Sequence, residues 1–367
     1  MEFENVIGQS RVKQILTFSL KRERLAHAYL FYGEPGVGKD AMAISMAMGL
    51  NCINKIIGGC GKCSSCSAIL RLESPGFRMI LPVPTKPKSM KEEKYLEILR
   101  EKALQRIENP YLEVTYDSDT PAAPVIGIDQ IRILKQEVML KLSGGYRVLL
   151  ISHAEKMTTE AANSLLKLLE EPPKGTIFFL TTAFPDQLPE TIVSRCQVIR
   201  FNSLSEEEIK NGLITRWNMS EQKAKFFAKM AGGSLERALK LADEDFEHKR
   251  KTAITFLKKS LSEDTLLRLE GVRDVLSQRE RAKIQELLKI LEMWLRDIFF
   301  LNLGSPEKVV NFDQREILED FKQRWPLFDA ENGMKYVEQA IDLVEKNVYI
   351  SLIIHSLSIE LRRCRDS

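Results

Sequence analysis

A glycine-rich loop at residues 33–39 constrains the fold of this chain more than any other segment. It reads Gly33-Glu34-Pro35-Gly36-Val37-Gly38-Lys39, which matches the G-x-x-x-x-G-K part of a phosphate-binding loop. An apolar run at residues 25–32 precedes it, and a stretch rich in Ala and Met follows at residues 41–50. A strand, a glycine loop and a helix in this order begin a βα unit that can hold phosphates on backbone N–H groups and on the helix dipole.

Two further apolar runs, at residues 147–151 and 176–181, have the character of buried parallel strands. Between them, residues 159–171 show the spacing of an amphipathic helix, which Pro172 and Pro173 end. The alternation of strands and helices predicts a doubly wound α/β domain over residues 1–201.

Helical patterns replace the α/β alternation after residue 201. The chain of 367 residues is long enough for more than one domain, and we expect a small helical domain at 202–247 and a larger one at 248–367. The proline-bounded segment 82–124 differs from its surroundings. We interpret it as a surface insertion with one helix at about residues 91–106, whose mixed charges form a solvated face.

The residues around the loop depart from the pattern of an ATPase at two places. Asp40 follows Lys39, where a Ser or Thr should bind magnesium. Ser152 and His153 follow the strand at 147–151, where an ATPase needs carboxylates. Two losses in one centre predict that this chain does not hydrolyse ATP. The residues that could still bind nucleotide are Gly33, Gly36, Gly38 and Lys39. The sequence leaves open whether ATP or ADP binds there.

Four cysteines lie within fifteen residues. Cys52, Cys60, Cys63 and Cys66 are spaced C-x7-C-x2-C-x2-C among several glycines. Four thiolates complete the tetrahedral shell of a zinc ion and leave no open coordination position. We therefore predict a structural zinc module at residues 52–66.

Charge and hydropathy exclude some classes of protein. The net charge of +3 gives no overall basic field for nucleic acid, and no apolar run approaches the roughly 18 residues of a membrane span. The start of the chain lacks the pattern of a signal peptide. We expect a cytoplasmic protein without membrane contact, in which disulfides are a weaker interpretation of the cysteines than zinc.

The motifs together resemble the AAA+ clamp-loader subunits of bacterial DNA polymerase III, and among them the delta-prime type. The resemblance covers residues 1–245 in order and spacing. Besides the glycine loop and the cysteine module, it is carried by the segments 6–9 (VIGQ), 27–31 (HAYLF), 128–132 (IDQIR), 154–157 (AEKM), 163–173 (NSLLKLLEEPP), 188–196 (LPETIVSRC) and 232–237 (GGSLER).

The resemblance implies an AAA+ α/β domain, a helical lid domain and a helical collar domain. It also implies that Arg195, in Ser194-Arg195-Cys196, acts in trans as an arginine finger in the ATP site of a neighbouring subunit. Arg237 matches the family's sensor-2 arginine, and Thr182 lies near its sensor-1 position. The implied partners are gamma/tau-type and delta-type subunits in a hetero-pentamer. The sliding clamp and primer-template DNA would be contacted through that assembly.

Three functions of different classes fit the sequence. The first is a non-hydrolysing delta-prime-type subunit that donates Arg195, which the broken centre and the intact arginine favour. The second is an ATP-hydrolysing gamma/tau-like motor subunit with an unusual magnesium site. The third is a separate nucleic-acid-binding zinc protein, which the near-neutral charge disfavours. The sequence assigns no role to the 82–124 insertion.

Overall fold

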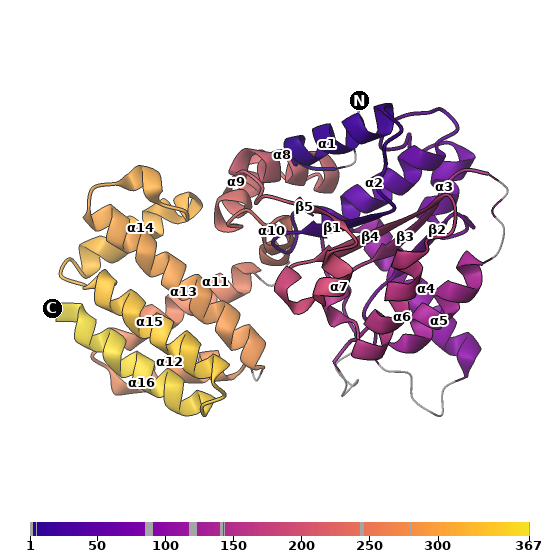
Figure 1. Cartoon of the computed structure of the whole chain (residues 1–367). Coiled ribbons are helices and arrows are strands. Elements are labelled where there is room, and N and C mark those ends of the chain that lie inside the picture. The colour runs from indigo at the N-terminus through magenta and orange to yellow at the C-terminus, as the bar shows by residue number, and fades with distance from the viewer. Residues whose placement is uncertain are drawn as a thin grey trace. The chain divides into compact units, whose positions relative to one another are not determined.

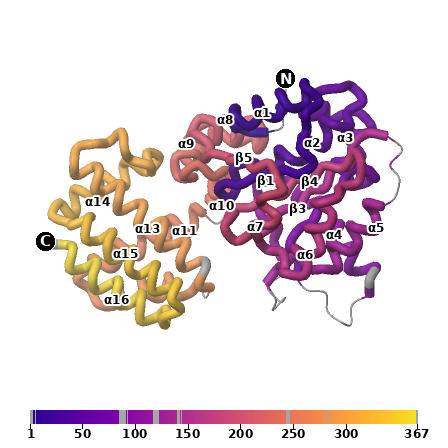
Figure 2. Tube along the Cα trace, in the orientation of Figure 1, coloured from indigo at the N-terminus to yellow at the C-terminus, as the bar shows by residue number. Residues whose placement is uncertain are grey.

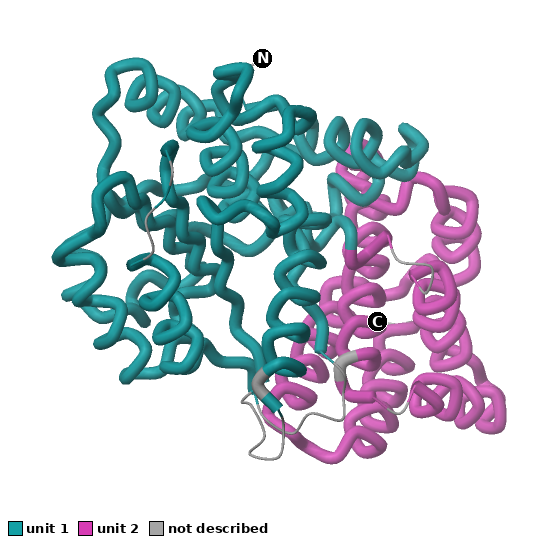
Figure 3. Tube along the Cα trace, turned by 90° about the vertical axis from the view of Figure 1, so that its right-hand side faces the viewer, with its two compact units in different colours: residues 1–239 teal, residues 240–367 magenta. Residues whose placement is uncertain are grey.

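The computed structural model describes residues 3–4, 6–84, 91–116, 123–139, 142, 144–242, 246–278 and 280–366. The chain divides into two compact units, Met1–Leu239 and Lys240–Ser367 (Figure 3). Among the described residues, no helix combines the length and the apolar character that a membrane span requires. The division into three domains, with boundaries after residues 201 and 247, stays a prediction.

The first unit contains a five-stranded parallel sheet with the order β2-β3-β4-β1-β5 (Figure 1). Its strands are β1 (Ala28–Tyr32), β2 (Phe77–Ile80), β3 (Arg147–Ile151), β4 (Thr176–Thr182) and β5 (Gln197–Arg200). The parallel α/β architecture expected from the sequence is confirmed. The three apolar runs are the three inner strands, because a strand with neighbours on both sides and helices on both faces has no solvent-facing side chains.

Helices connect the strands and cover both faces of the sheet (Figure 1). They are α1 (Ser10–Lys21), α2 (Lys39–Asn51), α3 (Ser64–Leu70), α4 (Glu92–Glu108), α5 (Ile128–Val138), α6 (Thr159–Glu170) and α7 (Glu190–Val193). In the order of the chain, α4 and α5 come between β2 and β3, and Figure 2 labels both helices. The insertion helix expected at about residues 91–106 is therefore present as α4.

Side chains of the strands point alternately to the two faces of the sheet, and each face packs against helices. One face packs Leu30, Leu149 and Phe178 against apolar residues of α5 and α6, while α2 lies against β3 and β4. In this parallel register, the carboxyl ends of β1, β3 and β4 meet at one edge of the sheet. Open α/β sheets bind ligands at that edge, and the glycine loop begins there directly after Tyr32.

Three short helices follow the sheet, namely α8 (Glu206–Trp217), α9 (Glu221–Met230) and α10 (Leu235–Leu241), whose last two residues belong to the second unit. The second unit is helical in its described part. It consists of α11 (Phe246–Ser260), α12 (Thr265–Leu276), α13 (Arg281–Asn302), α14 (Arg315–Arg324), α15 (Ala330–Glu345) and α16 (Ile350–Arg363), with short 3-10 turns. Trp294 of α13 is fully buried and packs edge-on against Phe321 of α14, which places the core of this unit around α13.

Candidate functional site

The glycine loop lies at the carboxyl edge of the sheet and leads directly into α2. Gly33 has a φ of 152°, and a Cβ atom there would lie 2.4 Å from the carbonyl oxygen of Phe201. Gly38 is the N-cap of α2 with a φ of 94°. The loop therefore has the strand-loop-helix context that a phosphate site requires.

Lys39 bonds to its own loop. Its Nζ donates to the carbonyl oxygens of Gly33, at 2.6 Å, and of Glu34, at 2.7 Å. Burial lowers the pKa of Lys39 to about 8, against the opposing attraction of Asp40. The ammonium group thus uses two of its three donors on loop carbonyls.

Asp40 is the centre of a buried polar cluster. It is 1% exposed and is followed in α2 by a run of buried, mostly apolar residues. Its Oδ2 accepts from Arg106 Nε at 2.6 Å and from Ser152 Oγ at 2.5 Å. Its Oδ1 accepts from Thr181 Oγ1 at 2.6 Å. Both carboxylate oxygens are therefore satisfied by side chains of the protein.

The cluster holds Asp40 in its ionised form. Burial alone would raise the pKa of this carboxyl group, but Arg106 and His153, with the hydroxyls of Ser152 and Thr181, lower it to about 2. The ion pair between Asp40 and Arg106 is buried on both sides, with side-chain exposures of 1% and 9%. A buried pair of this kind is costly to break from one side, because the remaining charge is left without a partner.

Asp40 and Ser152, the two departures from the ATPase pattern, contact each other directly. The loop position has a carboxylate in place of a hydroxyl, the end of β3 has a hydroxyl in place of a carboxylate, and the two are hydrogen-bonded. His153, the next residue, has a left-handed backbone with a φ of 52° and lies 3.3 Å from Glu155 Oε1. Burial would raise the pKa of Glu155, but His153 and Thr182 lower it, and the lowering outweighs the effect of burial.

The insertion reaches into this centre, which corrects the expectation that its charges form only a solvated face. Arg106 is 8% exposed and comes from the last turns of α4. Its Nη1 donates to the carbonyl of Leu112. Arg106 was not predicted as a site residue. The available signal was Asp40 itself, because a carboxylate on a buried helix face requires a buried cation.

Tyr111 follows α4 and covers the start of α2. Its hydroxyl accepts the backbone N–H of Ile7 at 2.8 Å, and its ring lies 3.0 Å from the position that a Cβ of Gly38 would take. Little space is left near the loop, where the cavity measures about 20 Å³. Its lining includes Gly36, Gly38, Lys39, Asp40, Arg106 and Thr182.

The helices after residue 201 contact the loop as well. The N–H of Leu235 donates to Gly36 O at 3.2 Å, and Ser234 Oγ donates to Pro35 O at 2.8 Å. Arg237 is exposed and lies against Gly232, whereas Thr182 lines the cavity. Whether these two act as sensor residues stays a prediction.

The four predicted zinc ligands lie together. The Sγ atoms of Cys52, Cys60, Cys63 and Cys66 are all within 4.8 Å of one another. Cys60 and Cys66 have their sulfur atoms 3.9 Å apart, close to the roughly 3.8 Å that tetrahedral Zn–S bonds of about 2.3 Å require. The N–H of Cys63 points to Cys60 Sγ at 3.3 Å. Such a donor set fits a zinc ion held by four thiolates.

Arg195 is partly exposed and lies after α7, away from the buried cluster. Its Nη2 donates to Glu170 Oε1 at 2.8 Å, and its Nη1 donates to Thr191 O at 2.9 Å. The side chains of Arg195 and Glu170 are 35% and 48% exposed. The guanidinium therefore lies at the surface, and its ion pair with Glu170 is accessible to solvent.

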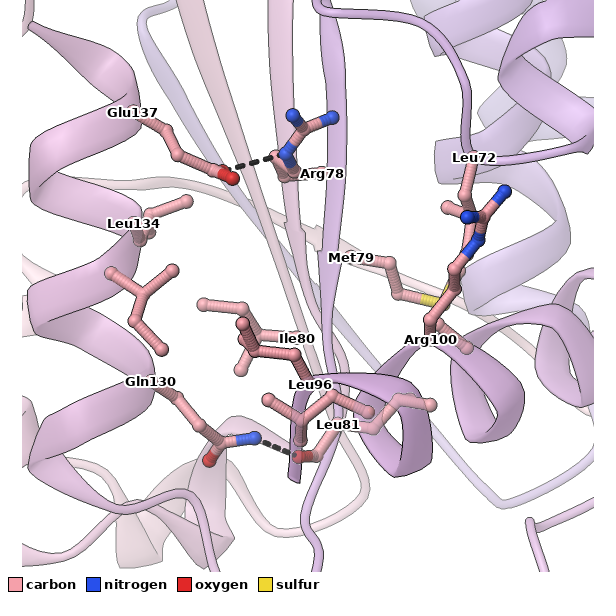
Figure 4. Close-up of a pocket in the computed structure, with 13 residues that line it drawn as sticks. Leu72, Arg78, Met79, Ile80, Leu81, Leu96, Arg100, Gln130, Leu134 and Glu137 are labelled. Carbon is pink, nitrogen blue, oxygen red and sulfur yellow. Dashed lines mark hydrogen bonds and ion pairs between the residues drawn. The ribbon is translucent and has the colours of Figure 1, made fainter. Parts of the chain in front are cut away.

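A separate groove of about 240 Å³ lies between β2, α4 and α5 (Figure 4). Leu96 and Ile80 line it, Arg78 Nε pairs with Glu137 at 2.6 Å, and Gln130 Nε2 donates to Leu81 O at 2.9 Å. Arg100 also faces it from α4. None of the sequence-predicted site residues lines this groove.

Comparisons with known proteins show what this chain is similar to. Residues 8–205 match the family model described as "DNA polymerase III, delta subunit". DNA polymerase III subunit delta' of Bacillus subtilis is 27% identical over 365 residues, which cover 96% of each chain. DNA polymerase III subunit tau/gamma of Haemophilus influenzae is 30% identical over 249 residues, 66% of this chain and 30% of that protein. A solved gamma subunit-related protein from Thermotoga maritima is 16% identical, with a TM-score of 0.40, over 96% of this chain and 99% of that chain.

Proposed function

The chain belongs to the DNA polymerase III delta subunit family as a delta-prime-type clamp-loader subunit, and on this basis we propose that it acts without hydrolysing ATP itself. In this proposal it donates Arg195 to the ATP site of a neighbouring subunit. Its partners are gamma/tau-type and delta-type subunits of a hetero-pentamer. That assembly loads the sliding clamp onto primer-template DNA.

The observation that carries the proposal is the ion pair between Asp40 and Arg106. ATP hydrolysis on a phosphate-binding loop needs a magnesium ion, held by a hydroxyl of the loop and a carboxylate of the neighbouring strand. Here Asp40 is already neutralised by a guanidinium at 2.6 Å, and the end of β3 supplies only the hydroxyl of Ser152. The residues do not fit a magnesium-nucleotide complex, which supports a subunit without its own turnover.

The surroundings of Arg195 support its role in trans. An exposed ion pair contributes only about 0–1 kcal/mol, so Arg195 can exchange Glu170 for a phosphate at little cost. An arginine donated to a γ-phosphate from another subunit offsets the charge that develops in the transition state. Its side chain is 35% exposed, so part of the guanidinium is open to contact from outside the chain.

A structural zinc ion in the module at residues 52–66 is part of the proposal. The four thiolates would complete its shell. Gly59, with a φ of 83°, lets this module approach α2, since a Cβ there would lie 2.3 Å from the Cβ of Met48. The zinc would therefore hold the module against α2 and would take no part in chemistry.

Steady-state ATP hydrolysis tests the proposal. We expect no turnover by the chain alone, and turnover by the reconstituted clamp loader that falls roughly a hundredfold or more with Arg195→Ala. Arg200→Ala, which changes another exposed arginine five positions along, is the matched control and should leave the rate unchanged. An unchanged rate with Arg195→Ala, in an assembly of normal composition, would contradict the finger.

The tau/gamma relatives favour a second candidate, an ATP-hydrolysing motor subunit, because they are as similar in sequence over the shared region. Turnover by the chain alone that Lys39→Ala abolishes would establish this alternative. Lys39 is the discriminating position, because in the proposed function its Nζ serves only the carbonyls of its own loop.

A further inference from the structure

We propose that residues 106–112 form an internal plug that closes the nucleotide site, with the guanidinium of Arg106 at the position where a magnesium ion would otherwise bind. This inference goes beyond the proposed function and does not depend on Arg195. It assigns a role to the insertion, whose segment after α4 turns back toward the glycine loop instead of remaining on the surface.

The chemistry of the cluster supports the place of the cation. A carboxylate and hydroxyl oxygens are the ligands that magnesium prefers in such sites. Asp40, Ser152 and Thr181 supply this set, and all three are nearly fully buried. The cation that contacts Asp40 is the guanidinium of Arg106, with Nε at 2.6 Å from Oδ2. A second cation at the same carboxylate would meet this positive charge in a buried environment.

The remaining volume argues against a bound nucleotide. The cavity beside the loop is about 20 Å³, enough for about one water molecule. Sites for small molecules and cofactors measure roughly 300–1,000 Å³. A triphosphate could enter only if the segment that contains Arg106 and Tyr111 moved away.

Contacts on several sides hold the plug in place. Arg106 is bonded to the carbonyl of Leu112, which closes the segment on itself. Tyr111 bonds the backbone N–H of Ile7 at 2.8 Å and meets Trp217 edge-on with ring centroids 6.3 Å apart. Arg216 lies over the same tyrosine ring at 5.5 Å. The plug therefore joins the N-terminal segment, the loop and helix α8.

The residues just before and at the start of α10 also hold the glycine loop. The N–H of Leu235 donates to Gly36 O, and the hydroxyl of Ser234 donates to Pro35 O. A ligand shifts a conformational equilibrium only by its differential affinity for the two states. Because Arg106 and Tyr111 fill the site, we expect nucleotide to cause no such shift in this chain.

Nucleotide binding by the isolated chain tests the plug. The probe is a fluorescent ADP analogue with magnesium, titrated into the wild-type chain and into the double variant Asp40→Ser with Arg106→Ala. The double variant removes both members of the ion pair, so neither charge is left buried alone, and it restores the G-x-x-x-x-G-K-S pattern. We expect no saturable binding by the wild type over the concentration range of the titration. The double variant should bind with a dissociation constant at least roughly tenfold below the highest concentration used.

Arg100→Ala is the matched control, because Arg100 lies on the same helix but lines the separate groove. This variant should behave like the wild type. Saturable binding by the wild-type chain in the micromolar range would overturn the plug. A folded double variant that binds no better than the wild type would also overturn it, since the plug would then not be what excludes nucleotide.

Hydrogen exchange on the wild type gives a second readout that needs no variant. The N–H of Ile7, which Tyr111 holds, should exchange slowly without nucleotide and at the same rate with millimolar MgATP. Faster exchange at Ile7 when MgATP is added would show that nucleotide displaces the plug. Because neither measurement involves Arg195, failure of the plug is distinguishable from failure of the finger.

Discussion

Ser152 donates its hydroxyl hydrogen bond to Asp40 Oδ2 over 2.5 Å. The two residues come from the end of β3 and the start of α2, and each has the chemical group that an ATPase places on the other element. In the sequence, the missing loop hydroxyl and the missing strand carboxylate are two separate departures from an ATPase. In the structure, the residues that replace them form one buried polar cluster with Arg106. This arrangement leads to several testable expectations.

The ion pair makes single substitutions costlier than the double substitution. Arg106→Ala leaves the Asp40 charge buried without its guanidinium, so we expect a loss of about 3–5 kcal/mol in the free energy of unfolding of the first unit. Adding Asp40→Ser should recover part of that loss, because no buried charge then remains. Urea unfolding of the two single variants and the double variant measures the coupling. Additive effects would show that the two side chains do not interact.

Acid should destabilise the first unit through Asp40. Its pKa in the folded chain, about 2, is below the ordinary value of 3.8, so the ionised form is favoured by folding. The stabilisation is complete above about pH 4 and is lost as the pH falls toward 2. We expect a contribution on the order of 2 kcal/mol. Unfolding free energies measured between pH 4 and 2 should therefore fall more steeply for the wild type than for the Asp40→Ser, Arg106→Ala double variant. Parallel curves would contradict the assignment.

The cysteine module should contain one zinc ion per chain. Replacement of Cys60 and Cys63 by Ser removes two of the four thiolates, and we expect loss of the metal together with unfolding of the module. Elemental analysis of freshly purified protein measures the zinc. The control is Cys364→Ser, which changes a buried cysteine of the second unit and should leave the zinc content unchanged. Protein without zinc at purification would refute the site.

Glu170 should matter little to the assembly. It pairs with Arg195 at 2.8 Å, but both side chains are partly exposed, and such pairs stabilise by at most about 1 kcal/mol. We therefore expect Glu170→Ala to change the stability of the chain by less than that and to leave ATP turnover by the clamp loader within roughly twofold. A large loss of turnover would mean that Glu170 holds Arg195 in its working position.

The chain alone should bind DNA weakly. Its net charge is only +3, and affinity for duplex DNA depends mainly on cations that neutralise phosphates. Fluorescence anisotropy with a primer-template duplex at physiological salt measures this. A tight and salt-sensitive complex of the isolated chain would favour the third hypothesis, a separate nucleic-acid-binding zinc protein.

Local patterns predicted the inner part of the fold well. The runs at 147–151 and 176–181 correspond to β3 and β4, and residues 25–32 contain β1, because inner parallel strands are continuously apolar. The edge strands β2 and β5 were missed. Both have only four residues and keep exposed or half-buried positions, so neither shows the signal of a buried strand.

The glycine loop and the cysteines of the candidate site were predictable from the sequence, but the partner of Asp40 was not. The loop and the cysteines are short-range motifs whose spacing carries the chemistry. The pairing of Asp40 with Arg106 joins residues 66 positions apart, and Arg106 lies in the last turn of a helix whose other charges are largely exposed. No local pattern distinguishes this arginine from its neighbours, so only the folded chain identifies it as the partner of Asp40.

The exchanged carboxylate and hydroxyl also restrict how such a sequence can evolve. Ser152→Asp alone would place two carboxylates against one guanidinium, and Asp40→Ser alone would leave the buried guanidinium of Arg106 without its carboxylate. Each single step toward an ATPase therefore passes through an unbalanced buried charge. Because Arg106 must change as well, recovery of a magnesium site requires three coordinated substitutions. Once the cluster has formed, single substitutions cannot easily restore the lost magnesium site.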